Sequence, residues 1–548
     1  MKFIALPLVA LLVLFQSCQP TSTADLLVYN AKIYTVDDSF SVVEAMVIKD
    51  GKIIATGTKE NLAQQYTCMD SLDAKGKFIY PGFIDAHAHF VGYATGLLTV
   101  DLTGTQSWEE ILEKLKTFAN ENPEGWIVGR GWDQNDWQNK AYPTNRDLNQ
   151  LFPDRPVLLT RIDGHAAIAN QSALAEAAID YKKSITGGEV VVANGEPTGL
   201  LIDNAVDLVS KHIPALSDQV FKKAILKAQE NCLAVGLTTI DDCGLDGLTI
   251  DKIKKLQEEG DVKLRIYAML SDHPDNYRYA EKNGILISDL LTVRSFKVYG
   301  DGALGSRGAC LLQPYHDQQE HYGFLLSNPA HFDSVANWCL SKGWQMNTHA
   351  IGDSGNRVIL NTYAKYLSQK PTEDLRWRIE HAQVVNTTDL ALFGQHKIIP
   401  SVQPTHATSD MYWAEDRLGK ERIASAYSYK QLLEQNRWIP LGTDFPVEDI
   451  SPFKTFCAAV FRKDIKGWPE NGFQSENALT REEALRGMTI WAARSNFEET
   501  QKGSLEKGKW ADFVILDTDL MNAPMEDCYK AKALYTFING KELFNAKK

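Results

Sequence analysis

The stretch that decides the fold is Pro81-Gly82-Phe83-Ile84-Asp85-Ala86-His87-Ala88-His89-Phe90. It begins with a turn pair, continues as a short apolar run and ends in two histidines that are one residue apart. Side chains in a strand alternate between its two faces, so His87 and His89 are predicted to point the same way. Two neighbouring imidazoles at a strand end can hold one divalent metal ion. We therefore predict a strand that ends at a metal site.

The middle of the chain repeats apolar strands with amphipathic helices between them. This alternation indicates a parallel α/β fold, here a (β/α)8 barrel of the TIM type. The eight predicted strands are Phe83–His87, Leu237–Asp242, Lys263–Leu270, Val293–Tyr299, Gln345–His349, Arg376–His381, Ile398–Gln403 and Trp438–Thr443. Helices are predicted from Ser217 to Val235, with Gly236 as the stop, and from Thr480, where Glu483 completes a capping box.

Both ends of the chain are rich in short strands that turn pairs such as Asp50-Gly51 separate. The economical interpretation is that residues 26–80 and 500–548 combine into one small β-sandwich, while residues 81–499 form the barrel. The long gap between the first two barrel strands, about 92–214, is then an insertion. We expect this insertion to cover the site.

The bulk composition is that of a globular enzyme. The chain has 548 residues, which suits a large barrel with an accessory domain. Its 57 basic and 70 acidic residues give a formal net charge of −13. An acidic balance disfavours nucleic acid or an anionic membrane as a partner held by charge.

The first residues read as a targeting signal. Lys2 precedes an apolar run from Phe3 to Phe15, which is too short to span a bilayer, since a span needs roughly 20 residues. Gln16-Ser17-Cys18 follows and resembles a bacterial lipoprotein signal, with cleavage before Cys18 and lipid on its thiol. This predicts a signal peptide over 1–17, a tether over 18–25, and an exported protein anchored to the cell envelope, in the periplasm or at the outer membrane. The alternative is an ordinary secretory signal in which Cys18 is incidental.

Polar residues recur where the predicted strands end, which is where active sites lie in such barrels. In chain order these residues are His87, His89, Lys297, His349, His381 and Asp444. Each has a structural alternative, as a core histidine bonded to a backbone carbonyl, a buried paired lysine or a loop-capping aspartate. Their order at successive strand ends favours metal ligation.

This set and its order resemble the amidohydrolase superfamily, which uses a His-x-His, a lysine in strand four, two later histidines and an aspartate after strand eight. The flanking sequence is similar to the branch that contains YtcJ-type hydrolases and N-substituted formamide deformylases. The matching stretches are Gly131-Trp-Asp-Gln-Asn-Asp-Trp137, Arg161-Ile-Asp-Gly-His165, Asp301-Gly-Ala-Leu-Gly-Ser306, Arg378-Ile-Glu-His-Ala-Gln383, Ser401-Val-Gln-Pro-Thr-His406 and Gly503-Ser-Leu-Glu-Lys-Gly-Lys-Trp-Ala-Asp512.

The resemblance implies one or two divalent ions. Imidazole and carboxylate ligands suit zinc, although iron or manganese also fits. It further implies that Lys297 is carbamylated and bridges two ions. The alternatives are a charged Lys297 that pairs with Asp301 or bonds substrate, with one ion held by the histidines and Asp444.

Further residues are assigned around this centre. Asp444 is expected to carry the proton, and His165 and His406 to contact the reacting group, with a structural hydrogen bond as the alternative for both histidines. The predicted substrate-binding residues are Trp132, Asp133, Trp137, Arg307 and Arg378. The two arginines are candidates for binding a substrate carboxylate, with surface ion pairs as the alternative.

The predicted activity is hydrolysis of a carbon–nitrogen bond in a small N-substituted amide, a formamide or a related cyclic amide by metal-activated water. One alternative is ester or phosphoester hydrolysis on the same metal site. Another is a lipoprotein that binds a ligand without catalysis. No nucleic acid partner is expected, contact with a membrane is expected through the lipid anchor alone, and a homodimer stays open.

Overall fold

The computed structural model describes residues 22–181 and 183–547. The predicted signal peptide and Cys18 lie outside these residues, so export and lipidation stay predictions. Strand β1 (Ser22–Tyr34) begins within the predicted tether of 18–25, because its first residues pair with β5 (Tyr66–Pro81). Within the described ranges, no helix combines the length and the apolar character that crossing a membrane requires.

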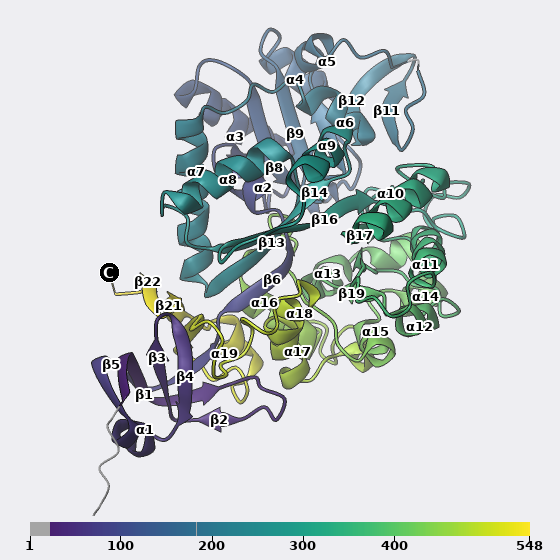
Figure 1. Cartoon of the computed structure of the whole chain (residues 1–548). Helices are drawn as coiled ribbons and strands as arrows, with labels where there is room; N and C mark the ends of the chain where they lie inside the picture. Colours follow the sequence, from purple (N-terminus) through teal and green to yellow (C-terminus); the bar gives the residue numbers. More distant parts are fainter. Residues whose placement is uncertain (1–21, 182, 548) are drawn as a thin grey trace, which may run out of the picture.

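The centre of the molecule is a curved parallel sheet whose strands follow one another in chain order (Figure 1). Among the described residues, its strands are β6 (Phe83–Ala88), β13 (Leu237–Leu245), β14 (Arg265–Ser271), β16 (Leu291–Tyr299), β17 (Gln345–Ala350), β18 (Arg378–His381) and β19 (Ile399–Ser401). They match the first seven predicted strands and confirm the predicted α/β barrel.

The predicted eighth strand, 438–443, is not a regular strand. Pro440 in its middle has no N–H to donate to a ladder. The segment nevertheless bridges the two edges of the sheet, because Leu441 forms an isolated parallel bridge with Val402 and its carbonyl accepts the N–H of Ala86 at 3.2 Å. The barrel is therefore closed by single backbone contacts rather than by a full strand.

Helices cover the outside of this sheet (Figure 1). They are α7 (Asp218–Ala234), α8 (Gly247–Glu258), α9 (Pro274–Asn283), α10 (Pro329–Lys342), α11 (Asp353–Leu367), α12 (Ala391–His396), α15 (Tyr429–Asn436), α16 (Pro452–Phe461), α17 (Arg481–Gly487) and α18 (Ile490–Ser495). Helix α7 begins after its N-cap Ser217. Helix α17 begins after its N-cap Thr480, which forms a capping box with Glu483 in the first turn; both starts are as predicted.

The insertion after β6 carries a sheet of its own. Its strands, in spatial order, are β11 (Gly188–Ala193), β12 (Glu196–Asp203), β10 (Ala166–Ala169), β9 (Val157–Arg161), β8 (Ile127–Trp132) and β7 (Val100–Asp101). Its helices are α3 (Trp108–Glu121), α4 (Arg146–Leu151), α5 (Gln171–Glu176) and α6 (Asn204–Ser210). Figure 1 shows this unit standing at one end of the barrel, beyond β13 and β16.

Strands from both chain ends share one sheet. Its order is β22 (Lys541–Asn545), β21 (Ala533–Ile538), β20 (Phe513–Leu516), β5, β1, β3 (Ala45–Lys49) and β4 (Lys52–Gly57). An isolated bridge between Lys52 and Trp510 joins β4 to the segment before β20. The sheet therefore curls on itself around a core of its own that includes Val28, Ile48 and Phe513.

Candidate metal centre

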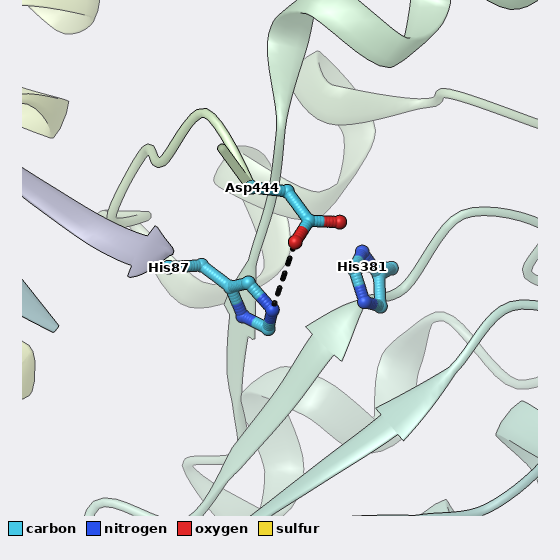
Figure 2. A group of neighbouring side chains, drawn as sticks. All are labelled: His87, His381 and Asp444. Carbon is cyan, nitrogen blue, oxygen red and sulfur yellow. Dashed lines mark ion pairs between the residues drawn. The ribbon is translucent and has the colours of Figure 1, made fainter. Parts of the chain in front are cut away.

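Three side chains that are far apart in the sequence converge at the carboxyl ends of the barrel strands (Figure 2). His87 comes from β6, His381 ends β18 and Asp444 follows the irregular closing segment. One ligand atom from each lies within 4.8 Å of the others, and all three residues are buried. Imidazole nitrogen and carboxylate oxygen are the donor types that bind zinc and related divalent ions.

Two buried atoms of this cluster lack hydrogen-bond partners among the described residues. They are Nδ1 of His381 and Oδ1 of Asp444, which Nε2 of His89 approaches to 3.2 Å without hydrogen-bond geometry. Buried polar atoms in proteins are almost always bonded, so an orphaned carboxylate oxygen beside an orphaned imidazole nitrogen needs an explanation. A divalent metal ion would coordinate both atoms. The residues present therefore fit the metal that was predicted from the sequence.

His87 is oriented by a carboxylate. Its Nδ1 lies 2.5 Å from Oε2 of Glu380, which leaves Nε2 facing Asp444. Burial lowers the pKa of His87 to about 4, so the neutral imidazole with a free lone pair is favoured. A carboxylate behind a histidine in this way fixes the ring and strengthens it as a metal ligand.

Lys297 lies in β16 against the same centre. Its Nζ is 3.1 Å from Nε2 of His87, and the side chain is buried. The alternative in which Lys297 pairs with Asp301 is wrong, because the Asp301 carboxylate accepts the backbone N–H groups of Cys310, Ile351 and Gly352 instead.

The other predicted histidines surround these three residues. Nε2 of His89 lies 3.2 Å from Oδ1 of Asp444. The ring of His349 lies 4.5 Å from that of His381 and 5.0 Å from that of His165, measured between centroids. His165, which belongs to the insertion, thus reaches the barrel centre.

His406 holds the second oxygen of Asp444. Its Nε2 lies 3.2 Å from Oδ2 of Asp444, and its Nδ1 lies 3.0 Å from Oε1 of Glu448. Burial acts to lower the pKa of His406, but the two carboxylates raise it to about 10. Burial likewise acts to raise the pKa of Asp444, yet the surrounding histidines hold it well below its ordinary value. Asp444 is therefore an ionised carboxylate.

Two predicted pocket residues instead pack inside the insertion. The indole of Trp132 is fully buried and donates to the carbonyl of Leu159 at 2.8 Å. Trp137 is also buried and donates to the carbonyl of Thr105 at 3.0 Å. Both rings belong to the hydrophobic core of the insertion, which differs from the predicted lining of a substrate pocket.

The charged residues predicted to bind substrate are paired within the protein. Asp133 bonds the guanidinium of Arg161. Arg378 is fully buried, with ion pairs to Asp241 at 2.9 Å and Glu380 at 2.7 Å. These contacts place Arg378 under the metal ligands as a support.

Arg307 binds Asp317, at 2.8 Å from Nη2. It lines a surface cavity of about 290 Å³ that residues of the metal centre do not line. Its position therefore differs from the predicted one in the substrate pocket.

Several residues that position the centre were not predicted from the sequence. Glu380 immediately precedes His381 in the stretch Arg378-Ile-Glu-His-Ala-Gln383, so the sequence did offer a signal for this carboxylate. Oδ1 of Asp85, two residues before His87, accepts the N–H of Thr443 at 2.9 Å and so ties β6 to the closing segment. Asp203 lies 2.6 Å from Nδ1 of His165, and no local pattern pointed to it.

Comparisons with known proteins extend these observations. A model of the amidohydrolase family matches residues 70–544. Protein LONG AFTER FAR-RED 3 of Arabidopsis thaliana is 33% identical over 95% of this chain and 92% of its own. Putative amidohydrolase YtcJ of Bacillus subtilis is 30% identical over 93% of this chain and 98% of its own. N-substituted formamide deformylase of Arthrobacter pascens is 24% identical over 95% of this chain and 98% of its own.

A solved structure shows the same fold at nearly full length. The crystal structure of an uncharacterized metal-dependent hydrolase from Pyrococcus horikoshii superposes with a TM-score of 0.74 at 28% identity, covering 91% of this chain and 99% of that chain. The predicted resemblance and the prediction of a hydrolase are thereby confirmed. By the family model, by relatives of matching length and by the metal-ligand geometry of its barrel, the chain belongs to the amidohydrolase family.

Proposed function

We propose that the protein hydrolyses the carbon–nitrogen bond of small non-peptide amides, among them N-substituted formamides. The observation that carries this proposal is the convergence of His87, His381 and Asp444, with two buried atoms among them that make no hydrogen bond. The bond type is supported by the similarity to an N-substituted formamide deformylase over 95% of the chain.

The ion would be held by His87, His381 and Asp444. We favour zinc, because imidazole and carboxylate are its common ligands at catalytic sites. Lys297 is proposed to be carbamylated, since its buried Nζ lies 3.1 Å from a ligand nitrogen and has no acidic partner among the described residues. A carbamate there would add a carboxylate-like donor and support a second ion next to His89.

The chemistry that a bound divalent ion supplies is a lower pKa for its water, about 7, and a polarised substrate carbonyl. Asp444 is an ionised carboxylate at the same point, so it can take the proton of the attacking water. The bond from His406 holds Oδ2 of Asp444, which leaves Oδ1 to face the reacting atoms. Asp444 then delivers the proton to the leaving nitrogen.

His165 is placed to stabilise the oxyanion that develops on the substrate. Burial acts to lower the pKa of His165, but the hydrogen bond that its ring donates to Asp203 and the charges of nearby acids raise it. The raised pKa favours the protonated ring more than in a free histidine, and in that form Nδ1–H is bound to Asp203 at 2.6 Å while Nε2–H can donate to the substrate. A fixed donor of this kind is worth roughly 100-fold or more in kcat.

The test is metal analysis joined to a substrate panel. Protein purified without chelator is expected to contain one or two ions per chain and to release amine from formamides and acylated amines. Lys297→Ala is expected to lower the metal count, and Asp444→Asn to lower kcat by about 10³-fold or more. Turnover of esters or phosphoesters with none of amides would contradict the bond assignment and leave the metal site standing. A chain without metal after reloading would contradict the centre itself and favour a binding protein.

A further inference from the structure

A second cavity lies at the end of the barrel that is opposite to the metal centre. Its volume is about 710 Å³, and its lining includes Ile399, the first residue of β19, and Trp438, the first residue of the closing segment. The ligands His381 and Asp444 lie instead where β18 and the closing segment end. Because substrates of such barrels bind at the carboxyl ends of the strands, a ligand of this cavity is not the compound that is hydrolysed.

The lining of this cavity is strongly basic. It contains one acid, Asp374, and four basic residues, which are Arg376, Lys397, Arg437 and Arg494. The chain as a whole has the opposite balance, with 57 basic and 70 acidic residues. The cavity is therefore a local concentration of positive charge on an acidic protein.

One of the four cations is occupied by acids of the protein. Nε of Arg376 donates to Asp374 at 2.8 Å, and its terminal nitrogens donate to the two carboxylate oxygens of Glu499 at 2.9 Å and 2.8 Å. Arg376 also donates to the backbone carbonyl of Arg494. These bonds neutralise the one acid of the lining and fix the end of helix α18, to which Arg494 belongs.

The side chains of the other three cations make no hydrogen bond and no ion pair with any described residue. Lys397 and Arg437 directly follow α12 and α15, two helices that pack against each other, and Arg494 lies in the last turn of α18. Basic residues at helix ends commonly bond the last carbonyls, but these three do not. The guanidinium of Arg494 lies instead over the indole of Trp438, 4.6 Å from the ring centroid, and its N–H groups stay without an acceptor.

Three unpaired cations on three helices suit a ligand with two negative charges. A phosphate monoester carries about 1.5–2 negative charges at pH 7 and has three strong acceptor oxygens. Arginine binds phosphate with paired N–H donors, and lysine binds it as a point charge. The cavity has the size of a small-molecule site, about 300–1,000 Å³, and the amides of Gln395 and Gln435 in its lining can bond the hydroxyl groups of such an ester.

We propose that this cavity binds the phosphate group of a small hydroxylated phosphate ester through Lys397, Arg437 and Arg494. A free phosphorylated compound and a lipid headgroup with a terminal phosphate present the same chemistry, and the experiment separates these two sources. The inference does not depend on the proposed hydrolysis, because the residues of the candidate metal centre do not line this cavity.

The test is calorimetric titration of the full chain with glycerol 3-phosphate at constant ionic strength, with glycerol as the uncharged control ligand. The wild type is expected to bind one phosphate ester per chain and no glycerol. Arg437→Gln and Arg494→Gln are each expected to weaken binding by about 10-fold or more, and the double variant by about 100-fold or more. Arg146→Gln changes an exposed arginine of α4 that also lacks an acidic partner within the described part of the chain, and it should keep the wild-type affinity.

Sedimentation with phosphatidylcholine vesicles that contain phosphatidic acid tests the lipid source, with pure phosphatidylcholine vesicles as the background. Binding to the acidic vesicles alone that the double variant loses would assign a lipid headgroup, whereas binding of glycerol 3-phosphate assigns a free compound. A wild type that binds neither, or a double variant that binds as well as the wild type, overturns the proposal. The melting temperature and metal content of each variant, both expected at wild-type values, show that the fold and the metal centre are retained.

Discussion

A chain of three buried groups sets the direction of the first metal ligand. Arg378 binds Glu380, and Glu380 binds Nδ1 of His87, so that Nε2 of His87 faces Asp444. The charge of Arg378 and the bond to His87 hold the pKa of Glu380 below its ordinary value, although burial acts to raise it. The imidazole therefore sits behind a carboxylate that stays ionised, which is the arrangement that strengthens a metal ligand.

Glu380→Gln removes this negative charge and retains the shape of the side chain. We expect metal affinity to fall by about 10- to 100-fold, because the ring loses the group that orients it and raises its basicity. Competition with a chelator measures the change, and added metal is expected to restore turnover. Glu499→Gln, which alters an ion pair with Arg376, is the control and should keep wild-type affinity. Unchanged affinity in Glu380→Gln would contradict the role of this carboxylate.

Asp410 introduces a pH dependence of stability. Burial raises its pKa to about 7, although the charge of His406 and the hydroxyl of Tyr427, 2.8 Å away, act to lower it. A carboxyl whose pKa is higher in the folded than in the unfolded state stabilises the fold fully at pH values below its unfolded-state pKa. This stabilisation is lost as the pH rises through about 7. Between pH 5 and pH 8, the free energy of unfolding should therefore fall by about 2 kcal/mol less in Asp410→Asn than in the wild type. Urea unfolding at both pH values measures this, and parallel losses would contradict it.

The weakest element of the barrel is also the one that carries Asp444. The closing segment contacts β6 so closely that a Cβ atom on Gly442 would lie 2.5 Å from the backbone nitrogen of His87. The N–H of Asp444 donates to the carbonyl of His87 at 2.7 Å. The closing segment therefore fixes His87 and Asp444, two of the candidate metal ligands, relative to each other.

Gly442→Ala should disturb this element. The new methyl group has no space, so we expect the free energy of unfolding to fall by about 2 kcal/mol or more and metal affinity to fall with it. Gly96→Ala is the control, because nothing lies within 4 Å of a Cβ atom at Gly96, the last residue of helix α2 (Phe90–Gly96). Urea midpoints and metal content of the two variants give the comparison. Equal stability of both would show that the closing segment can shift without cost.

At the scale of the whole molecule, a buried ion pair joins the curled end sheet to the barrel. Nε of Arg265, in β14, lies 2.6 Å from Oδ2 of Asp512, which precedes β20, and both side chains are buried. The carbonyl of Asp512 also accepts the N–H of Gly82, just before β6. The sheet of the chain ends is thus tied to the strand that carries the His-x-His pair.

Arg265→Met should uncouple the two units. It leaves Asp512 buried without its cation, which costs about 3–5 kcal/mol, whereas loss of an exposed pair costs about 1 kcal/mol or less. Lys222→Met, at a partly exposed pair with Asp261, is the matched control. The fall in urea midpoint should be several times larger for Arg265→Met. Adding Asp512→Leu should recover part of it, because the unpaired charge is removed; no recovery would contradict this account.

Sequence periodicity was enough to place most of the barrel. Seven strands, the insertion after the first and the helix starts at Ser217 and Thr480 follow from patterns that repeat over a few residues. The eighth strand was predicted from its apolar residues, but Pro440 and the tight approach of Gly442 to β6 prevent a regular ladder there. Trp132 and Trp137 were predicted to line a pocket but pack in a core. This prediction failed because the sequence does not show which side of a strand meets a core.

The sequence by itself determined the family, the barrel and the metal-binding residue types, because these depend on motifs and on short-range alternation. The tertiary structure alone decided which residues pair. Glu380 pairs with His87, Asp203 pairs with His165, and Arg378 and Arg307 bind acids of the protein. The physical reason is that burial and charge pairing depend on contacts between distant positions, such as His87 and Glu380, which are 293 residues apart, and no local pattern encodes such contacts.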